Sequence, residues 1–362
     1  MRMRPTVAII LPPREGFSPL AVGAIGLLVR RHVQACPDFA SVVLGLPLDE
    51  PFPEVDFRPI RPSWFPGNAT RRYAGGVAAA VRAIRPNLIE VHNRPDVALF
   101  LAHRFPAIPV SLFLHNDPQG MRGARTEVAR LTLIARLARI IPVSAYIAGR
   151  MPPSDRVVVL PNCLDLAAIP PSPAVRDKLI LFAGRVVADK GADCFVAACA
   201  RALPDLPGWR AEMIGADRFR ADSPDTPFVR HLRPQAQAAG VAMLGYRPHQ
   251  EVLAAMARAA ILVVPSRWPE PFGLTALEGL ACGATLLYAR NGGLAEVAGG
   301  AGITIDPENI PALAAAMIDA ALHPAPCPAR AAQFGLGPIG TALGTLRRHT
   351  LDAWSRGRSP SI

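Results

Sequence analysis

The sequence predicts an α/β protein made of two doubly wound parallel sheets. Short apolar runs alternate with stretches of helical periodicity along most of the 362 residues. The alternation stops at the proline-rich stretch Asp165–Asp177 and then starts again. A chain of this length can form two domains with a hydrophobic core each, so we expect one sheet on either side of this stretch.

In the first half, each expected strand is an apolar run bounded by polar or turn-forming residues. The expected strands are Thr6–Leu11, Ser41–Leu44, Leu88–His92, Pro109–His115, Ile140–Ser144 and Arg156–Leu160. Helical spacing predicts a helix that ends near Val33 and further helices at Ala69–Ile84, Pro95–Arg104 and Arg125–Arg139.

The second half repeats this alternation. The expected strands are Leu179–Ala183, Arg210–Ile214, Val241–Leu244, Ile261–Val264 and Ala284–Tyr288. The expected helices are Ala192–Leu203, a segment from Gly273 to Cys282, Ile310–Leu322 and Ile339–Trp354. These elements predict a first domain at residues 1–165, a linker at 166–177, a second domain at 178–335 and a terminal helical segment at 336–362.

The formal net charge of +11 is concentrated in the first half. Residues 1–170 carry 20 basic and 12 acidic groups, a net +8, whereas residues 171–362 carry 19 and 16, a net +3. Such an excess fits nucleic acid, an anionic membrane surface or acidic small molecules. Aromatic residues make up only 6% of the chain and form no basic-aromatic platform, so no nucleic acid partner is expected.

The six cysteines show no CxxC spacing, and most have apolar neighbours in the sequence. No window approaches the roughly 20 apolar residues of a membrane span, and the apolar run behind the basic first residues is too short for a signal peptide. We therefore expect buried thiols in a reducing compartment and a cytoplasmic protein.

The stretch from Ile261 to Val297 contains the most informative pattern. Glu270 lies on the loop after the strand Ile261–Val264, where open α/β sheets bind their ligands. Gly273 then opens a helix whose first backbone N–H groups suit a phosphate. Glu278 lies about one and a half turns into that helix, close enough to accept hydrogen bonds from a hydroxylated ring. The alternative is that both glutamates are ordinary solvated acids.

A second pattern begins the second domain. The strand Leu179–Ala183 ends in Gly184-Arg185, and Asp189-Lys190-Gly191 precedes the next helix. Two cations at a strand end suit a pyrophosphate. Only two of the 39 basic residues are lysines, and Lys190 is one of them. A lysine in such an arginine-rich chain indicates that this position requires a compact ammonium group. The alternative is an arginine that caps the sheet and a solvated turn.

Both patterns resemble elements of one known family. Glu270-Pro-Phe-Gly-Leu-Thr-Ala-Leu-Glu278 resembles the E-x7-E signature of retaining, family-4 glycosyltransferases of the group 1 type. Gly184–Gly191 resembles the G-R-x(3–4)-[ED]-K-G element of the same family. The resemblance implies a GT-B fold, in which two Rossmann-like domains face a cleft and the terminal helix, here within 336–362, crosses back to the first domain.

The resemblance also implies the site residues. His115 and Glu270 would be catalytic, and the donor would be bound by Arg185, Lys190, Phe272, Gly273, Leu274, Thr275, Glu278, Gly16 and Gly215. Asn291-Gly292-Gly293 with Glu296 resembles the family's G-G-x-x-E loop. This chain departs from the family in two places: Gly16 is a single glycine where a pair is usual, and Cys163 replaces the glycine of P-N-G-[VI]-D. The turn at Cys163 must therefore avoid positive φ or be strained.

The implied activity is the transfer of a hexose, with retention, from a nucleotide-diphosphate sugar to a glycan or a lipid-linked glycan. Envelope polysaccharide or lipopolysaccharide synthesis is the expected setting. No cofactor and no metal are expected, because Arg185, Lys190 and helix N–H groups would stabilise the diphosphate. Two alternatives stay open: a sugar-nucleotide epimerase with this fold, and a non-catalytic membrane-associated component of a polysaccharide assembly complex. A dinucleotide dehydrogenase fits poorly, since no G-x-G-x-x-G follows an expected strand.

Residues 122–141 indicate a membrane contact. On a helix, Arg122, Arg125, Arg136 and Arg139 would gather on one side, opposite a leucine- and isoleucine-rich side that Arg130 interrupts. A basic amphipathic helix can lie on an anionic bilayer, so peripheral membrane association is one expectation. The other is a helix whose apolar side packs on the sheet.

Overall fold

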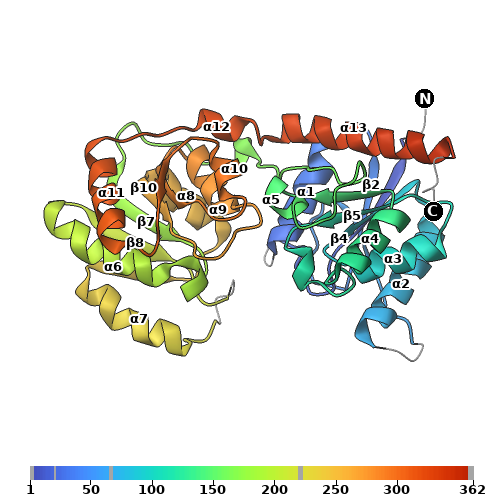
Figure 1. Cartoon of the computed structure of the whole chain (residues 1–362), viewed down its shortest axis with the longest axis horizontal. Coiled ribbons are helices and arrows are strands. Elements are labelled where there is room, and N and C mark those ends of the chain that lie inside the picture. The colour runs from blue at the N-terminus through green and yellow to red at the C-terminus, as the bar shows by residue number, and fades with distance from the viewer. Residues whose placement is uncertain (1–3, 20–21, 65–67, 219–222, 358–362) are drawn as a thin grey trace. The chain divides into compact units, whose positions relative to one another are not determined.

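The computed structural model describes residues 4–19, 22–64, 68–218 and 223–357 (Figure 1). It divides into two compact units, residues 1–163 with 336–362 and residues 164–335. Each unit contains a six-stranded sheet in which every neighbouring pair of strands is parallel. The predicted α/β fold with two doubly wound sheets is confirmed.

The sheet of the first unit has the order β3-β2-β1-β4-β5-β6. Its strands are β1 Thr6–Ile10, β2 Ala40–Gly45, β3 Asp56–Pro59, β4 Leu88–His92, β5 Val110–Leu114 and β6 Arg139–Pro142. Its helices are α1 Ala24–Ala35, α2 Ala69–Ile84, α3 Pro95–Arg104, α4 Glu127–Arg136, α5 Ala145–Ala148 and α13 Leu336–Ser355. The central strands β4 and β5 are buried along their whole length, as expected for a parallel sheet covered on both faces.

The strand predicted at Arg156–Leu160 is wrong. Only Val157 forms a bridge, to Ile140 of the edge strand β6. The segment still runs along β6, because Val158 N–H donates to the Ile140 carbonyl at 2.9 Å and Leu160 N–H donates to the Pro142 carbonyl at 3.0 Å. Pro142 has no N–H to donate in return, so the ladder cannot continue.

The helix predicted at Arg125–Arg139 is too long, and residues 122–141 do not form one amphipathic helix. The helix α4 covers only Glu127–Arg136, and Leu137 adopts an extended conformation with φ −98° and ψ 150°. Arg139 and the next residues form β6. The residue before Pro142 is disfavoured in a helix, and the β-branched Ile140 and Ile141 suit a strand.

The sheet of the second unit has the order β12-β11-β10-β7-β8-β9. Its strands are β7 Asp177–Ala183, β8 Arg210–Ile214, β9 Val241–Gly245, β10 Ala259–Val264, β11 Thr285–Ala289 and β12 Ile303–Ile305. Its helices are α6 Ala192–Ala202, α7 Pro227–Ala238, α8 His249–Arg258, α9 Leu274–Ala281, α10 Leu294–Ala298, α11 Ile310–Leu322 and α12 Ala329–Ala332. The helices α7 and α8, and the short strands β3 and β12, were not predicted.

Residues 166–177, expected as a linker, belong to the second unit. Ser172 Oγ donates to the Cys282 carbonyl at 2.7 Å. Arg176 donates to the carbonyls of Ala257 and Ala259 at 2.9 and 2.7 Å. Because helices leave their last carbonyls without intrahelical partners, this arginine stabilises the end of α8.

Within the described residues, no helix is long and apolar enough to cross a membrane.

Candidate active site

The loops at the carboxyl edge of the second sheet bring most of the predicted site residues to one edge. Arg185 follows β7, Gly215 follows β8 and Glu270 follows β10, while Gly245 ends β9 and Asn291 follows β11. Since all these strands are parallel, their ends lie on the same side of the sheet. Ligands of open α/β sheets bind at this edge.

A lysine and a glutamate from two of these loops form an ion pair. Lys190 Nζ contacts Glu270 Oε1, and the two side chains are 23% and 11% exposed. Ser266 Oγ donates to the same carboxylate oxygen at 2.9 Å. Asn291 Nδ2 in turn donates to the Ser266 carbonyl at 2.8 Å. The ammonium and the carboxylate are therefore held in fixed positions, and the ammonium is the more exposed of the two.

Two glycines permit this arrangement. Gly191 has φ +69°, and a Cβ there would lie 2.0 Å from the Pro265 carbonyl oxygen. Gly292 has φ +63°, and a Cβ there would lie 2.3 Å from the Glu270 carbonyl oxygen. Any larger residue would push the Lys190 loop or the Asn291 loop away from the loop that carries Glu270.

The helix α9 begins directly beside Glu270. Gly273 is its N-cap, with φ +106°, and no side chain caps the helix start. The backbone N–H groups of Gly273, Leu274 and Thr275 are thus those that a helix leaves for an anion. The preceding Phe272 is buried and packs edge-to-face on Phe334, with ring centroids 5.7 Å apart. Phe272 therefore anchors the loop, and its ring is not exposed to a ligand.

Glu278 has a partner that the sequence did not reveal. His249 Nε2 lies 2.8 Å from Glu278 Oε1, and Glu278 is only 6% exposed. His249 begins α8, immediately after the loop of Gly245. A lone histidine after a proline gives no local signal of a pairing with a residue 29 positions later.

Arg185 differs from Lys190 in its surroundings. Its side chain is partly buried, and it makes no hydrogen bond or ion pair with any other described residue. A guanidinium with all its donors unused can bind an oxyanion through two parallel hydrogen bonds. The Arg185 guanidinium can therefore bind a ligand directly, whereas the Lys190 ammonium is already paired with Glu270.

The two remaining predicted site residues belong to the first unit. His115 follows β5, and its Nε2 lies 2.8 Å from His92 Nδ1. Its backbone N–H donates to Asn93 Oδ1 at 2.8 Å. Burial lowers the pKa of His115 to about 3, so its imidazole is neutral at physiological pH.

Gly16 lies on the loop between β1 and α1, and its carbonyl accepts a hydrogen bond from Gly23 at 3.2 Å. The neighbouring Glu15 was not among the predicted site residues. Glu15 Oε1 accepts a hydrogen bond from Gly26 N–H at 2.8 Å, so this carboxylate occupies the start of α1. Burial raises the pKa of Glu15.

The turn at Cys163 avoids strain. Among the described residues other than glycine, only Glu50, Arg85 and Asn93 have positive φ. The Cys163 carbonyl accepts a hydrogen bond from Arg31 at 3.1 Å.

In the part of the chain that the structure covers, no group of three or more His, Cys, Asp or Glu side chains is placed to hold a metal ion.

Sequence comparison places the second unit in a known family. Residues 169–334 match the profile of glycosyl transferases group 1, and this part of the chain belongs to that family. An exopolysaccharide phosphotransferase of Streptomyces coelicolor is 28% identical over 251 residues, 66% of this chain and 25% of that protein. A glycogen synthase of Mycobacterium tuberculosis is 26% identical over 272 residues, 69% of this chain and 64% of that protein. The chain thus matches a quarter of the first relative and just under two thirds of the second.

Solved structures share the fold of the whole chain. A sucrose-phosphate synthase from Thermosynechococcus elongatus has a TM-score of 0.77 and 20% identity, covering 97% of this chain and 100% of that one. Anabaena HepE in complex with UDP-glucose has a TM-score of 0.74 and 17% identity, covering 95% and 100%. At these identities the likeness concerns the fold alone, which is the GT-B fold.

Proposed function

We propose that this protein is a retaining glycosyltransferase that moves a hexose from a nucleotide-diphosphate sugar to a glycan or lipid-linked glycan. One observation carries the proposal. The Lys190–Glu270 pair lies at the start of α9, at the sheet edge that also presents the unpaired Arg185. Group 1 membership of residues 169–334 supports the same reaction class.

The cations and the helix start suit a departing diphosphate. When the bond between the sugar and the diphosphate breaks, negative charge grows on the phosphate oxygens. Arg185, Lys190 and the N–H groups of residues 273–275 would stabilise that charge without reorganising. This donor set performs the work of a divalent metal, so we propose a metal-independent reaction with no cofactor.

The glutamates would recognise the two hydroxylated parts of the donor. Glu278 would accept hydrogen bonds from the ribose hydroxyls. Glu270, beside Lys190, would bind hydroxyls of the transferred sugar or stabilise the positive charge that develops on it. Gly215 would approach the nucleoside closely. HepE and its complex with UDP-glucose make a uridine donor the first to test.

The remaining roles belong to the first unit. His115, neutral and hydrogen-bonded to His92, would contact a sugar hydroxyl, and Gly16 would lie against the donor or acceptor. The named relatives act in exopolysaccharide and glycogen chemistry, which supports a glycan acceptor in polysaccharide or lipopolysaccharide synthesis.

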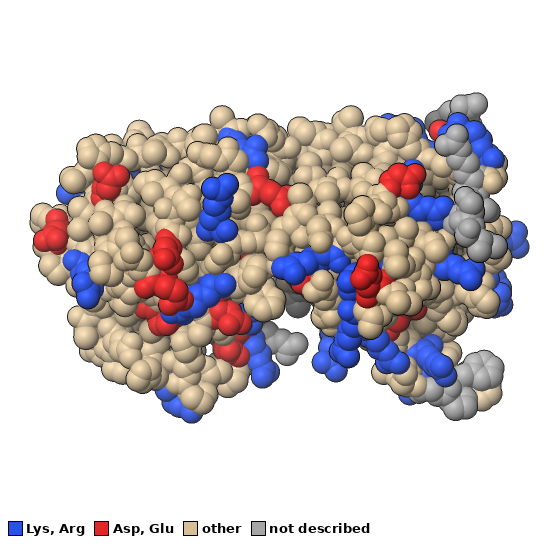
Figure 2. All heavy atoms as spheres, viewed as in Figure 1, with Lys and Arg blue, Asp and Glu red and all other residues tan. Residues whose placement is uncertain are grey.

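An anionic membrane surface is a further proposed partner. Figure 2 shows basic side chains, with some acidic ones, gathered on one face of the first unit over α3 and α4. On α4, Val128 is 73% exposed and Leu131 is 49% exposed, although Leu133 is buried in the core. Exposed apolar residues beside arginines suit the interface of a lipid bilayer.

The test is binding and slow hydrolysis of UDP-, GDP- and ADP-sugars in the presence of EDTA. We expect one donor to bind wild-type protein, and Lys190→Ala to weaken that binding about tenfold or more, since a charge-assisted contact is lost. Lys178→Ala is the matched control, because Lys178 is the other lysine and lies exposed at the start of β7.

Failure has two distinct forms. If no nucleotide sugar binds the folded protein at millimolar concentration, the donor site is refuted and a non-catalytic role in an assembly complex replaces it. If a donor binds and its sugar is converted without any acceptor, the protein is an epimerase. The configuration of the transferred sugar, read by NMR, tests retention.

A further inference from the structure

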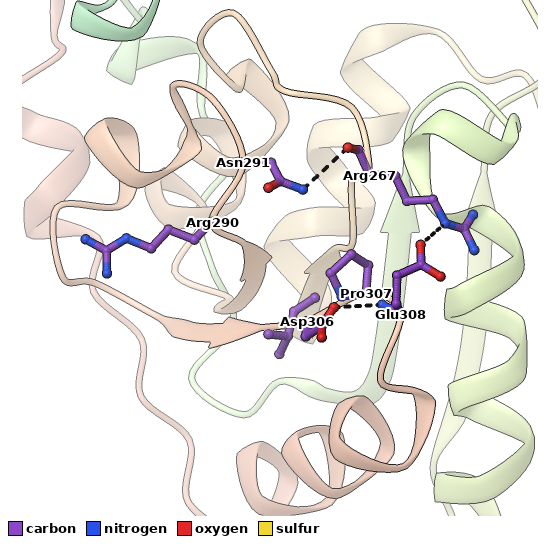
Figure 3. Close-up of a pocket in the computed structure, with 7 residues that line it drawn as sticks. Arg267, Arg290, Asn291, Asp306, Pro307 and Glu308 are labelled. Carbon is purple, nitrogen blue, oxygen red and sulfur yellow. Dashed lines mark hydrogen bonds and ion pairs between the residues drawn. The ribbon is translucent and has the colours of Figure 1, made fainter.

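A small, open cavity lies at the carboxyl edge of the second sheet, next to the Glu270 loop but outside the proposed diphosphate contacts. Its volume is about 330 Å³. Its polar lining comes from three successive loops, after β10, β11 and β12: Arg267, Arg290, Asn291, Asp306 and Glu308 (Figure 3). Ligand pockets of roughly 300–1,000 Å³ are typical, so this cavity has room for one ring but not for a lipid.

Along the edge of the sheet, the loops that line this cavity come directly after the loops that carry the proposed donor-binding residues. Gly245 and Gly215 follow β9 and β8, Arg185 follows β7, and Glu270 follows β10. The next loops along the edge, after β11 and β12, line the cavity. If the nucleoside lies at β8 and β9 and the diphosphate at β7 and β10, the cavity lies on the sugar side.

Two hydrogen bonds connect the cavity to the Lys190–Glu270 pair. Asn291 lines the cavity and donates to the Ser266 carbonyl at 2.8 Å. Ser266 Oγ donates to Glu270 at 2.9 Å. A single serine therefore joins the cavity to the proposed catalytic carboxylate.

The side chains that line the cavity carry almost no net charge, because two arginines are balanced by two carboxylates. Arg267 is fully engaged, since it makes two hydrogen bonds to Asp193 at 2.6 and 2.9 Å and a third to Glu308. Asp306 Oδ1 accepts from the Glu308 backbone N–H at 3.0 Å, which leaves its other oxygen free. Arg290 makes no hydrogen bond or ion pair with another described residue, and in Figure 3 it extends to the side opposite Arg267.

We infer that this cavity is a binding site for one neutral pyranose ring, with Arg290 and Asp306 as its hydrogen-bonding residues. A free guanidinium donates and a free carboxylate oxygen accepts, and the hydroxyl groups of a sugar ring do both. An anionic ligand would meet Asp306 and Glu308, and a cationic one would meet Arg290, so a neutral polyhydroxylated ligand fits best.

The site deepens the proposed function and rests on it. The ring comes either from the donor sugar or from the acceptor glycan. The loop after β10, which supplies Arg267 to the cavity, also carries an exposed aromatic residue. Trp268 is 51% exposed, and its backbone N–H donates to the Asp189 carbonyl at 3.0 Å, which fixes the backbone at this position. Such a ring can pack against the apolar face of a sugar.

The experiment is saturation-transfer NMR on the full chain with methyl α-glucoside, methyl α-mannoside and methyl α-galactoside. We expect transfer to at least one of them, and a loss of about fivefold in affinity for both Arg290→Ala and Asp306→Asn. Asparagine keeps the oxygen that accepts from Glu308, so the second variant retains its fold. Arg201→Ala, an exposed arginine on α6, is the control and binds like wild type.

Competition separates the two sources of the ring. If UDP-glucose displaces the glycoside, the cavity holds the donor's sugar; if both bind together, it holds the acceptor's. The inference is overturned if no glycoside binds, or if Arg290→Ala and Asp306→Asn both bind as wild type does. Binding of UDP-glucose itself, measured on the same samples, reports separately on the proposed function.

Discussion

Arg347 on the last helix, α13, and Glu90 on β4 form a buried ion pair in the first unit. Nε and one terminal nitrogen of the guanidinium contact the two carboxylate oxygens at 2.9 and 2.7 Å, and both side chains are 1% exposed. The residues are 257 positions apart, so this contact fastens the end of the chain to the centre of the first sheet.

We predict that Arg347→Met destabilises the first unit by about 3–5 kcal/mol, because Glu90 is left buried with an unpaired charge. The double variant Glu90→Leu with Arg347→Met should recover most of that loss, since both charges are then absent. Urea unfolding followed by circular dichroism measures the difference. A loss below about 1 kcal/mol in Arg347→Met would contradict the prediction.

Glu270→Gln should separate nucleotide binding from transfer. In the unliganded protein Glu270 neutralises Lys190. Removing its charge frees the ammonium for a diphosphate, so UDP should bind severalfold more tightly, while sugar transfer should fall by about 100-fold or more. Calorimetry with UDP and a transfer assay measure the two effects. Weaker UDP binding in Glu270→Gln would show that the carboxylate holds Lys190 in its binding position and does not compete with the ligand.

His249→Ala should raise the KM for the donor by about fivefold and leave kcat within twofold, because His249 orients Glu278 and touches no reacting atom. The variant His249→Gln, which retains a donor that can reach Glu278, should recover most of the affinity. If neither variant changes the KM, the contact has no part in donor binding.

The sequence predicted the stretch around β10 and α9 well because each element there has a strong local signal. The apolar run of β10, the glycine at position 273 and the regular spacing in α9 agree with one another. The roles of Arg185, Lys190, Glu270 and Glu278 stay predictions. The structure adds that Lys190 and Glu270 contact each other across 80 residues.

Other features could not be read from local patterns. The helix α7 starts at Pro227 and contains Pro234, and α8 follows Pro248. Because proline disfavours the interior of a helix, these residues argued against predicting either helix from the sequence. Part of the cavity lining, Asp306 and Glu308, follows the three-residue strand β12, a run too short to predict. Contacts such as His249 with Glu278 depend on tertiary packing, for which a single sequence holds no signal.

Acidification should destabilise the first unit because of its buried imidazoles. Burial lowers the pKa of His32 and His92 well below the usual value, and that of His115 to about 3. The ring of Phe113 packs on both His32 and His92, with centroids 5.7 and 4.5 Å from theirs. Both ring nitrogens of His32 lack a hydrogen-bond partner among the described residues, so a proton on this ring would have no stabilising contact.

In the unfolded chain these histidines bind protons near pH 6.5, whereas in the folded unit they stay neutral to much lower pH. As the pH falls from about 7 to 5, the unfolded state takes up protons that the folded state cannot. The free energy of unfolding therefore falls, by about 1.4 kcal/mol per pH unit for each fully buried imidazole once the pH is below 6.5. Above pH 7 both states are neutral and the effect vanishes.

His32→Phe should reduce this pH dependence by the share of one imidazole, while His103→Gln, an exposed histidine on α3, should leave it unchanged. Denaturant unfolding at pH 7, 6 and 5 on the three proteins measures the slopes. An unchanged slope in His32→Phe would mean that His32 already binds a proton in the folded unit, with an anion or a water that satisfies its two ring nitrogens.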